Sequence, residues 1–430
     1  MPRFKLLQDW LTWQETLHPT EIELGLHRVL SVFKKLHPGN FTCPVVTVAG
    51  TNGKGSSMHM LETIYRADGY KTASYTSPHL LRYNERICIN GNPVDDQLII
   101  NAFQRIDDAR AEISLTYFEF GTLAALDIFM RQQPDIVLLE VGLGGRLDAV
   151  NIIDSDVALI TSIDIDHTQW LGNDRDSIGR EKAGIMRNSK PAVCSDTDIP
   201  RSILQYATEM GTPFYRLNYE FSYILTKDRW SWNYSDIALN QLPVPALHGA
   251  HQYQNAAGVL MVVLLLMEQR PVSFEAICEG LQNSNLAGRF QTLPGRSNWI
   301  CDVAHNPDSV AKLSQILANE PVQGRTIALL GMLSDKDIPA ALRVIMEHID
   351  IWHISPLPTK RSATASEVSK ILKGLNVTEE CISLQLSIEQ AYRAIDALAT
   401  EDDRVVIFGS FYTVAETMKV ALSVAEQALQ

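Results

Sequence analysis

Val45-Val-Thr-Val-Ala-Gly50-Thr-Asn-Gly53-Lys54-Gly55-Ser56-Ser57 is the stretch that decides the fold. An apolar run leads into a glycine-rich turn with one lysine, and a helical pattern follows, which predicts a buried strand, a loop and a helix. Glycines permit a tight turn whose N–H groups can surround a phosphate, and Lys54 can reach the β- and γ-phosphates. The spacing departs from GxxxxGK[ST], because Val48 stands where the first glycine would be. A plain strand–helix turn with an exposed lysine is therefore the alternative.

Around this stretch, short β-branched runs alternate with longer helical patterns. This alternation predicts an α/β protein with a largely parallel sheet. The predicted strands are 44–49, 136–141, 157–162, 299–303, 326–330, 351–355 and 405–408. A long helical stretch covers 251–270, and the glycine- and proline-bearing segment 286–296 predicts a domain boundary, although an ordinary loop would look similar.

Composition narrows the class of protein. The chain has 430 residues, with 37 basic against 50 acidic side chains, a formal charge of −13. Such an acidic balance argues against nucleic acid or an anionic membrane as a partner. The six cysteines form no CxxC pair, and the N-terminus has no secretory pattern. The longest apolar run, 256–267, is too short for a membrane span, so we expect a cytoplasmic protein.

Two predicted strands of the first half end in groups that suit a metal. Glu140 closes the strand 136–141, and a carboxylate at that edge can hold Mg²⁺ against phosphates. A helix cap or a pair with Arg146 is the alternative for Glu140. His167 follows the strand 157–162 beside Asp166, although imidazole is an uncommon Mg²⁺ ligand and an ordinary loop histidine fits equally well. Lys182 stands in a helical turn whose residue pattern favours a solvated, charged face.

Polar residues also follow three strands of the second half. They are Asp302, His305 and their neighbours at the end of the strand 299–303, Gly331–Asp337 after the strand 326–330, and Gly409-Ser410 after the strand 405–408. Three polar loops at one edge of a parallel sheet predict a second binding surface. The alternative is that any α/β domain carries such loops.

The ordered set of motifs carries a resemblance to a known family. In chain order the motifs are GTNGKGS (50–56), SPHL (77–80), LEVGLGGRLDA (139–149), SIDIDHT (162–168), REKAGI (180–185), HQYQN (251–255), GRFQ (288–291), DVAHNP (302–307), GMLSDKD (331–337) and FGSFYTV (408–414). Together they resemble the Mur ligase superfamily, and within it the bacterial folylpolyglutamate synthases that also act as dihydrofolate synthases. The resemblance runs from about Leu24 to about Val414, nearly the whole chain.

The resemblance implies two domains and a set of site residues. Residues 1–287 would form a P-loop-type ATPase domain with a mostly parallel sheet that also binds the pterin, and 288–430 a smaller Rossmann-like domain that binds glutamate and part of ATP. The residues that match ATP-binding positions are Gly50, Thr51, Asn52, Gly53, Lys54, Gly55, Ser56, Asn255, Arg289 and Asp302. Those that match magnesium ligands are Ser77, Glu140 and His167. Those that match acceptor- or glutamate-binding positions are Arg82, Thr116, Phe118, Asp148, Ala149, His305 and Ser410.

By the same resemblance, the chain is an ATP-dependent amide ligase. It would use one or two Mg²⁺ ions and add L-glutamate to dihydropteroate and to reduced folates through an acyl phosphate. Lys54, Lys182, Asp302 and His305 are the catalytic candidates, and Lys182 matches a lysine that CO₂ carbamylates in such ligases. The implied state is a monomer.

Three alternatives remain. The chain could be a synthase that acts on folates alone. It could be a ligase for UDP-muramoyl precursors, although too little chain precedes Gly50 for the UDP-binding domain of those enzymes. It could also be a nucleotide-binding regulatory module without ligase activity, although such a module would not explain the second set of polar loops.

Overall fold

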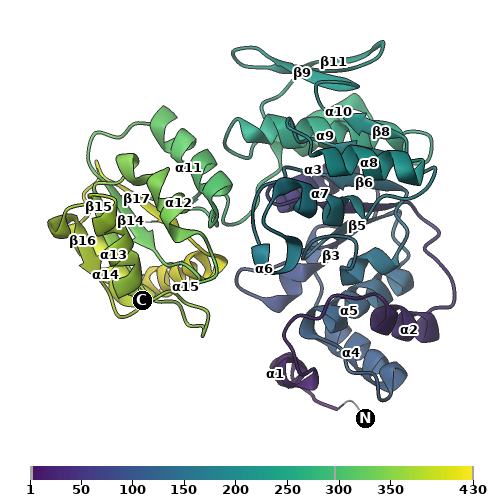
Figure 1. Cartoon of the computed structure of the whole chain (residues 1–430), viewed down its shortest axis with the longest axis horizontal. Helices are drawn as coiled ribbons and strands as arrows, with labels where there is room; N and C mark the ends of the chain where they lie inside the picture. The colour runs from purple at the N-terminus through teal and green to yellow at the C-terminus, as the bar shows by residue number, and fades with distance from the viewer. Residues whose placement is uncertain (1–2, 295–296, 429–430) are drawn as a thin grey trace. The chain divides into compact units, whose positions relative to one another are not determined.

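The computed structural model describes residues 3–294 and 297–428, and the chain divides into two compact units (Figure 1). Unit 1 contains the residues up to 246 together with 252–284, and unit 2 contains 247–251 and the residues from 285 onward. The division after residue 284 lies slightly before the expected boundary at 287/288. Gly295 and Arg296, at the end of the expected boundary segment, lie outside the described residues.

Unit 1 is built on an eight-stranded sheet. In spatial order its strands are β4 (Asn92–Pro93), β3 (Ile87–Ile89), β2 (Thr72–Tyr75), β5 (Ile136–Glu140), β1 (Val45–Ala49), β6 (Val157–Ile160), β7 (Ala192–Cys194) and β8 (Phe214–Arg216). The six strands from β2 to β8 run parallel, whereas β3 and β4 form an antiparallel margin. Because β2, β5, β1 and β6 are neighbours, the loops that follow them leave the sheet at one edge.

Helices cover both faces of this sheet (Figure 1). The helices on one face are α1 (Leu7–Leu17), α2 (His27–Leu36), α4 (Asp96–Arg110), α5 (Tyr117–Gln132), α7 (Arg175–Ala183) and α8 (Arg201–Met210). Those on the other are α3 (Lys54–Ala67), α9 (His251–Leu265) and α10 (Phe274–Gln282). Short helical turns occur at η1 (Tyr83–Arg86), η2 (Ala149–Ile152) and α6 (Thr168–Leu171).

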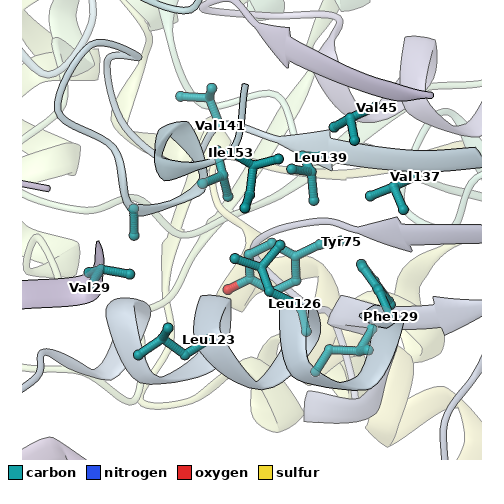
Figure 2. Close-up of a cluster of buried hydrophobic side chains, with 14 of the residues drawn as sticks. Val29, Val45, Tyr75, Leu123, Leu126, Phe129, Val137, Leu139, Val141 and Ile153 are labelled. Atoms are coloured by element: carbon teal, nitrogen blue, oxygen red, sulfur yellow. The ribbon is translucent and has the colours of Figure 1, made fainter. Parts of the chain in front are cut away.

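The core beneath α5 follows the alternation of a strand buried on both faces. Every second residue of β5, including Val137 and Leu139, joins Tyr75 of β2 in one buried cluster with α5 (Figure 2). In Figure 2, Leu126 and Phe129 of α5 project toward these strand side chains. The intervening residues of the strands face α3. The sheet is therefore fixed from both sides, and its loops have a rigid base.

A small antiparallel sheet, which the sequence did not predict, also belongs to unit 1. Its strands are β9 (Phe221–Leu225), β10 (Trp230–Tyr234) and β11 (Ile237–Leu242). Trp230 and Trp232 are fully buried beneath it, and the Trp232 indole donates to the Ala257 carbonyl of α9 across 3.1 Å.

Unit 2 has a six-stranded sheet that is parallel except at one edge. In spatial order its strands are β12 (Gln291–Leu293), β13 (Asn298–Cys301), β17 (Arg404–Phe408), β14 (Thr326–Leu330), β15 (Ile351–Ile354) and β16 (Ile382–Leu384). Its helices are α11 (Pro307–Asn319), α12 (Ile338–Arg343), α13 (Ala365–Gly374), α14 (Ile388–Leu398) and α15 (Phe411–Ala428), with short turns η3 (Met346–His348) and η4 (Glu379–Cys381). Trp352 and Phe408 lie at the centre of its core.

These units confirm the predicted α/β class with a mostly parallel sheet and a smaller second α/β unit. All seven predicted strands are present, each within two residues of its expected bounds, and the predicted helix from residue 251 ends at Leu265. Within the described residues, no helix combines the length and the apolar character that crossing a membrane requires.

Candidate active site

Four adjacent strand ends of unit 1 carry most of the predicted site residues. Val48 of β1 pairs with Glu140 of β5, and Ala49 pairs with Ile160 of β6. Tyr75 of β2 pairs with Leu139 of β5. The glycine-rich loop after β1, the carboxylate of Glu140, the loop after β2 and the polar loop after β6 therefore meet at the carboxyl edge of the sheet, where open α/β sheets bind ligands.

The glycine-rich loop has the backbone that a phosphate cradle requires. Gly53 caps α3 in a left-handed conformation, with φ 87°. A Cβ at Gly53 would lie 2.5 Å from Oδ1 of Asn255, so only glycine fits against that buried side chain. The first turn of the 14-residue α3 then opens onto the loop with Lys54, Gly55 and Ser56.

Lys54 and the rest of the loop are held in place. The Lys54 ammonium donates to the carbonyls of Gly50 and Thr51 at 3.0 and 3.2 Å. The Asn52 carbonyl accepts the Thr161 hydroxyl at 2.7 Å, which ties the loop to the end of β6. Asn255 of α9 lies against Gly53, so it adjoins the predicted nucleotide loop of unit 1.

Ser77 and Glu140, which the family resemblance matches to magnesium ligands, lie together in the structure. The backbone N–H of Ser77 donates to Oε2 of Glu140 across 3.0 Å, and Glu140 is only 5% exposed. The alternative pair with Arg146 is not formed, because Arg146 bonds Oε1 of Glu181 at 2.8 Å.

His167 lies in the loop after β6, ahead of α6. Its backbone is left-handed, with φ 53°, and its N–H donates to Oδ1 of Asp166 across 2.7 Å. Nε2 of His167 is 4.0 Å from Oδ2 of Asp166. Among the described residues, no three His, Cys, Asp or Glu side chains form a group that could hold a metal ion by themselves.

Lys182 departs from what its residue pattern suggests. The pattern favours a solvated face, but Lys182 is 3% exposed, and its side chain has no hydrogen-bond or ion-pair partner in the described part of the chain. Burial is the main cause that lowers the pKa of Lys182 to about 7, with help from the nearby Lys54 cation and against the opposing effect of Asp166. The loop after β5 fixes this turn of α7, because the Arg146 N–H donates to the Glu181 carbonyl at 2.8 Å.

A group of aromatic residues lies beside this edge. Thr116 caps α5 in a reciprocal pair with Glu119, which sets the direction of Phe118 in the first turn. The Phe118 ring lies against Gly142, where a Cβ would come within 2.6 Å of Cζ. The ring centroids of Phe118 and Tyr75 are 6.0 Å apart.

Asp148 lies on the other side of the same loop. Its carboxylate accepts the N–H groups of Leu143 and Val150 at 2.8 and 3.0 Å, and Ala149 begins η2 directly after it. Burial raises the pKa of Asp148 to about 6, although these N–H groups and Lys54 act in the opposite direction. Four of the predicted acceptor residues therefore lie around the loop that follows β5. They are Thr116, Phe118, Asp148 and Ala149. Arg82 does not join them, since its side chain is 72% exposed and contacts Asp96.

The predicted residues of unit 2 gather at the carboxyl edge of its own sheet. Asp302 follows β13 and accepts the N–H groups of Phe290 and Ala304 at 2.9 and 2.8 Å. Burial raises the pKa of Asp302, and the Arg289 cation opposes that rise.

His305 and Ser410 lie on adjacent loops of unit 2. Nδ1 of His305 is 2.7 Å from the Val303 carbonyl, an acceptor, so this nitrogen carries the proton. Ser410 is buried after β17, and the neighbouring Gly409 N–H donates to the Ala304 carbonyl at 2.8 Å. The Asp302–His305 loop and the Ser410 loop are thus bonded to each other.

Sequence reasoning gave no individual role to four residues that shape the site of unit 1. They are His79, Glu85, Arg86 and Thr161. Thr161 gave no signal, because a threonine at a strand end is ordinary. His79 belongs to the SPHL motif, and Glu85 and Arg86 belong to the segment 80–86, which resembles a mobile loop that contacts the acceptor in the family. Only their contacts show what each of them does.

Known protein families match the sequence of both units. The chain matches the Mur ligase middle domain over residues 48–263 and the glutamate ligase domain of Mur ligases over residues 288–411. It is 43% identical to the dihydrofolate synthase/folylpolyglutamate synthase of Escherichia coli strain K12, over 96% of this chain and 95% of that one.

Solved structures show the same fold. E. coli FolC in complex with DHPP and ADP superposes with a TM-score of 0.91 at 41% identity, over 98% of this chain and 99% of that one. A bifunctional folylpolyglutamate synthase/dihydrofolate synthase with Mn, AMPPNP and L-glutamate bound superposes with a TM-score of 0.90 at 43% identity, over 98% and 99% of the two chains. This chain therefore belongs to the dihydrofolate synthase/folylpolyglutamate synthase family of the Mur ligases.

Proposed function

We propose that this chain is an ATP-dependent ligase that joins the amine of L-glutamate to the carboxylate of dihydropteroate and of reduced folates. The observation that carries the proposal is the meeting of a glycine-rich loop, a buried carboxylate and an aromatic group at one sheet edge of unit 1. The relatives named for both activities, and the solved relative with a nucleotide analogue and L-glutamate, support it.

The loop of unit 1 suits a nucleoside triphosphate. Glycine is required at position 53, and the N-terminus of α3 presents the N–H groups of its first turn and a positive potential. Lys54 now bonds loop carbonyls and would turn to the phosphates when they arrive. Arg289 and Asp302 of unit 2 are the proposed further ATP contacts.

Ser77, Glu140 and His167 are the residues that would hold Mg²⁺. They provide a hydroxyl, a buried carboxylate and an imidazole, and the first two are already joined by a hydrogen bond. When bound, Mg²⁺ would neutralise charge on the phosphates during transfer.

Lys182 fits carbamylation. The unprotonated amine is the form that attacks CO₂, and a pKa of about 7 makes that form abundant at neutral pH. The new N–C bond turns the amine into an anionic carbamate with release of a proton. A buried anion beside Lys54 would then replace the buried cation that burial disfavours.

The acceptor would lie along the aromatic group. Phe118 offers a flat face to a pterin or aminobenzoyl ring, and Asp148 offers a carboxylate to ring N–H groups. A carboxylate does not acylate an amine, because oxide is a poor leaving group. Attack of that carboxylate on the γ-phosphate gives an acyl phosphate and ADP, and the glutamate amine then displaces phosphate to form the amide.

Unit 2 would hold the glutamate. Since Nδ1 of His305 carries the proton, Nε2 is the basic nitrogen of the neutral ring, which suits it to take a proton from the amine. Asp302 is fixed by two backbone N–H groups and is another polar group of that loop.

The test is ADP release with Mg-ATP and L-glutamate, with 7,8-dihydropteroate or tetrahydrofolate as the acceptor. We expect turnover with both and none with Lys54→Ala. Turnover with tetrahydrofolate alone would reduce the proposal to a synthase acting on folates, and silence with both would overturn it.

A further inference from the structure

The loop between β2 and β3 is organised by one carboxylate. Glu85 accepts the backbone N–H groups of three consecutive residues, Leu80 at 2.7 Å, Leu81 at 2.9 Å and Arg82 at 2.7 Å. Three such bonds to an ionised acceptor fix the path of the turn. The loop begins at Ser77, so its geometry bears on the candidate metal site as well.

The turn directs Arg82 away from the aromatic group. Nη2 of Arg82 contacts Oδ1 of Asp96 at 3.4 Å, and Asp96 is itself held by the Asn84 amide at 2.9 Å. Asp96 lies in the first turn of α4, and 72% of the Arg82 side chain is exposed. The cation that family likeness assigned to the acceptor thus has a carboxylate partner on the protein surface.

Arg86, one helical turn later, has the opposite surroundings. Its guanidinium carbon lies over the rings of Tyr83 and Tyr117, 5.4 and 5.6 Å from their centroids. Its Nε donates to Nδ1 of His79 across 2.8 Å. Within the described part of the chain, no carboxylate pairs with Arg86.

Arg86 lies next to the aromatic group that Tyr75, Tyr117 and Phe118 form. The Arg86 cation opposes the rise that burial causes in the pKa of Tyr75, and the Tyr75 ring is the neighbour of Phe118. Tyr117 comes directly before Phe118 in the first turn of α5. Arg86 is therefore a partly buried cation, without an acidic partner, against the surface where the acceptor's rings would lie.

We infer that Arg86, rather than Arg82, is the residue that binds the carboxylate of the acceptor. The inference rests on the proposed function and adds a substrate-binding residue to it. A guanidinium matches the two oxygens of a carboxylate, and its fork is already oriented by His79 and the tyrosine rings. Dihydropteroate and reduced folates both carry the carboxylate to be ligated, so one cation serves both acceptors.

The test compares two ligands on the whole protein. One is 7,8-dihydropteroate, and the other is 6-hydroxymethyl-7,8-dihydropterin, which lacks the carboxylate. In calorimetric titrations, Arg86→Gln should weaken dihydropteroate binding about 10- to 100-fold, the effect of losing charge-assisted hydrogen bonds. Binding of the uncharged pterin should change less than about threefold. In turnover, the acceptor KM should rise while the KM values for ATP and glutamate stay unchanged.

Three further variants make the outcome decisive. Arg86→Lys should recover part of the dihydropteroate affinity, because it keeps the positive charge but loses the paired N–H donors of the guanidinium. If Arg86→Gln has a much lower melting temperature than wild type, Arg86→Lys takes its place in the comparison. Arg216→Gln removes an arginine that also lies over a tyrosine ring, at 4.4 Å, and should change neither ligand. Arg82→Gln tests the rival assignment and should have the smaller effect.

Equal losses for both pterins in Arg86→Gln would mean that Arg86 only packs the loop, and would overturn the inference. A larger effect in Arg82→Gln would overturn it as well. Wild-type protein that binds neither pterin and releases no ADP would instead overturn the proposed function.

Discussion

Ser77 and Glu140 are joined by a 3.0 Å hydrogen bond from the backbone N–H of Ser77 to the Glu140 carboxylate. The bond connects the loop after β2 to the end of β5, across two paired strands. It places a hydroxyl-bearing residue and a buried carboxylate together before any ligand arrives. Such preorganisation is what a site for a hard divalent cation needs.

Replacing Glu140 by glutamine removes the negative charge of the side chain but keeps its size. The amide oxygen can still accept the Ser77 N–H, so the loop should stay in place, but the negative charge is lost. Because a bound divalent ion supplies several kcal/mol of charge stabilisation, we expect ADP release to fall about 100-fold or more. The assay is ADP release as a function of Mg²⁺ concentration, with Glu220→Gln, which removes a carboxylate that pairs with Arg216, as the matched control. Unchanged Mg²⁺ dependence in Glu140→Gln would remove Glu140 from the metal site.

Gly53→Ala should damage the phosphate loop. A Cβ at this position would meet Oδ1 of Asn255 at 2.5 Å, and the backbone has φ 87°, which costs a non-glycine residue about 1–2 kcal/mol. We expect nucleotide affinity to drop at least tenfold and the free energy of unfolding to fall by about 1–2 kcal/mol. Titration with AMPPNP and chemical denaturation measure the two effects.

Gly39→Ala is the control for that experiment, since nothing lies within 4 Å of a Cβ built there. It should leave nucleotide binding intact. If Gly53→Ala bound AMPPNP as tightly as wild type, the loop around Gly53 would not be the phosphate site.

The sequence predicted the framework of this site well and its details less well. Strands β1, β5 and β6 are continuous apolar runs, and residues at their ends had to share an edge, so Lys54, Glu140 and His167 could be placed together. Lys182 could not be placed by pattern, because a charged turn looks solvated unless one knows what packs against it. Its burial results from the loop 142–148 closing over α7, a tertiary contact with no local signal.

Arg82 and Arg86 also show that the local sequence does not reveal the tertiary surroundings of a side chain. Both are arginines in one polar run, and nothing in their spacing distinguishes them. Their surroundings differ because Glu85 gathers three backbone N–H groups and turns the chain between them. Short strands such as β2, β7 and β8 were missed for a related reason, since three or four residues are too few to show a period.

Acid should destabilise the protein through His251. Burial is the main cause that lowers the pKa of His251 to about 4, and the Lys312 and Arg289 cations act in the same direction. A group whose folded pKa lies below its unfolded value of about 6.5 stabilises the fold fully above pH 6.5, and this contribution is lost as the pH falls toward 4. The loss is on the order of 3 kcal/mol. The free energy of unfolding should therefore fall less steeply between pH 7 and pH 4.5 in His251→Gln than in wild type. His348→Gln is the control and should behave as wild type does. Parallel curves for His251→Gln and wild type would contradict this account.

The proposed carbamylation of Lys182 would have a direct spectroscopic consequence. The side chain is buried, has no ion-pair partner in the described residues and has a pKa of about 7, so its amine is available to CO₂ at neutral pH. Protein incubated with ¹³C-bicarbonate should show one carbamate carbon signal, absent from Lys182→Ala and from Lys182→Arg, whose guanidinium stays protonated. Lys54→Ala provides the control, because it removes a lysine from the same site but leaves the carbamylated one in place. That signal should fade as the pH falls below 7, since protonation removes the nucleophile. A spectrum without the signal under saturating bicarbonate, from protein that still turns over, would show that the ligase works with an unmodified lysine.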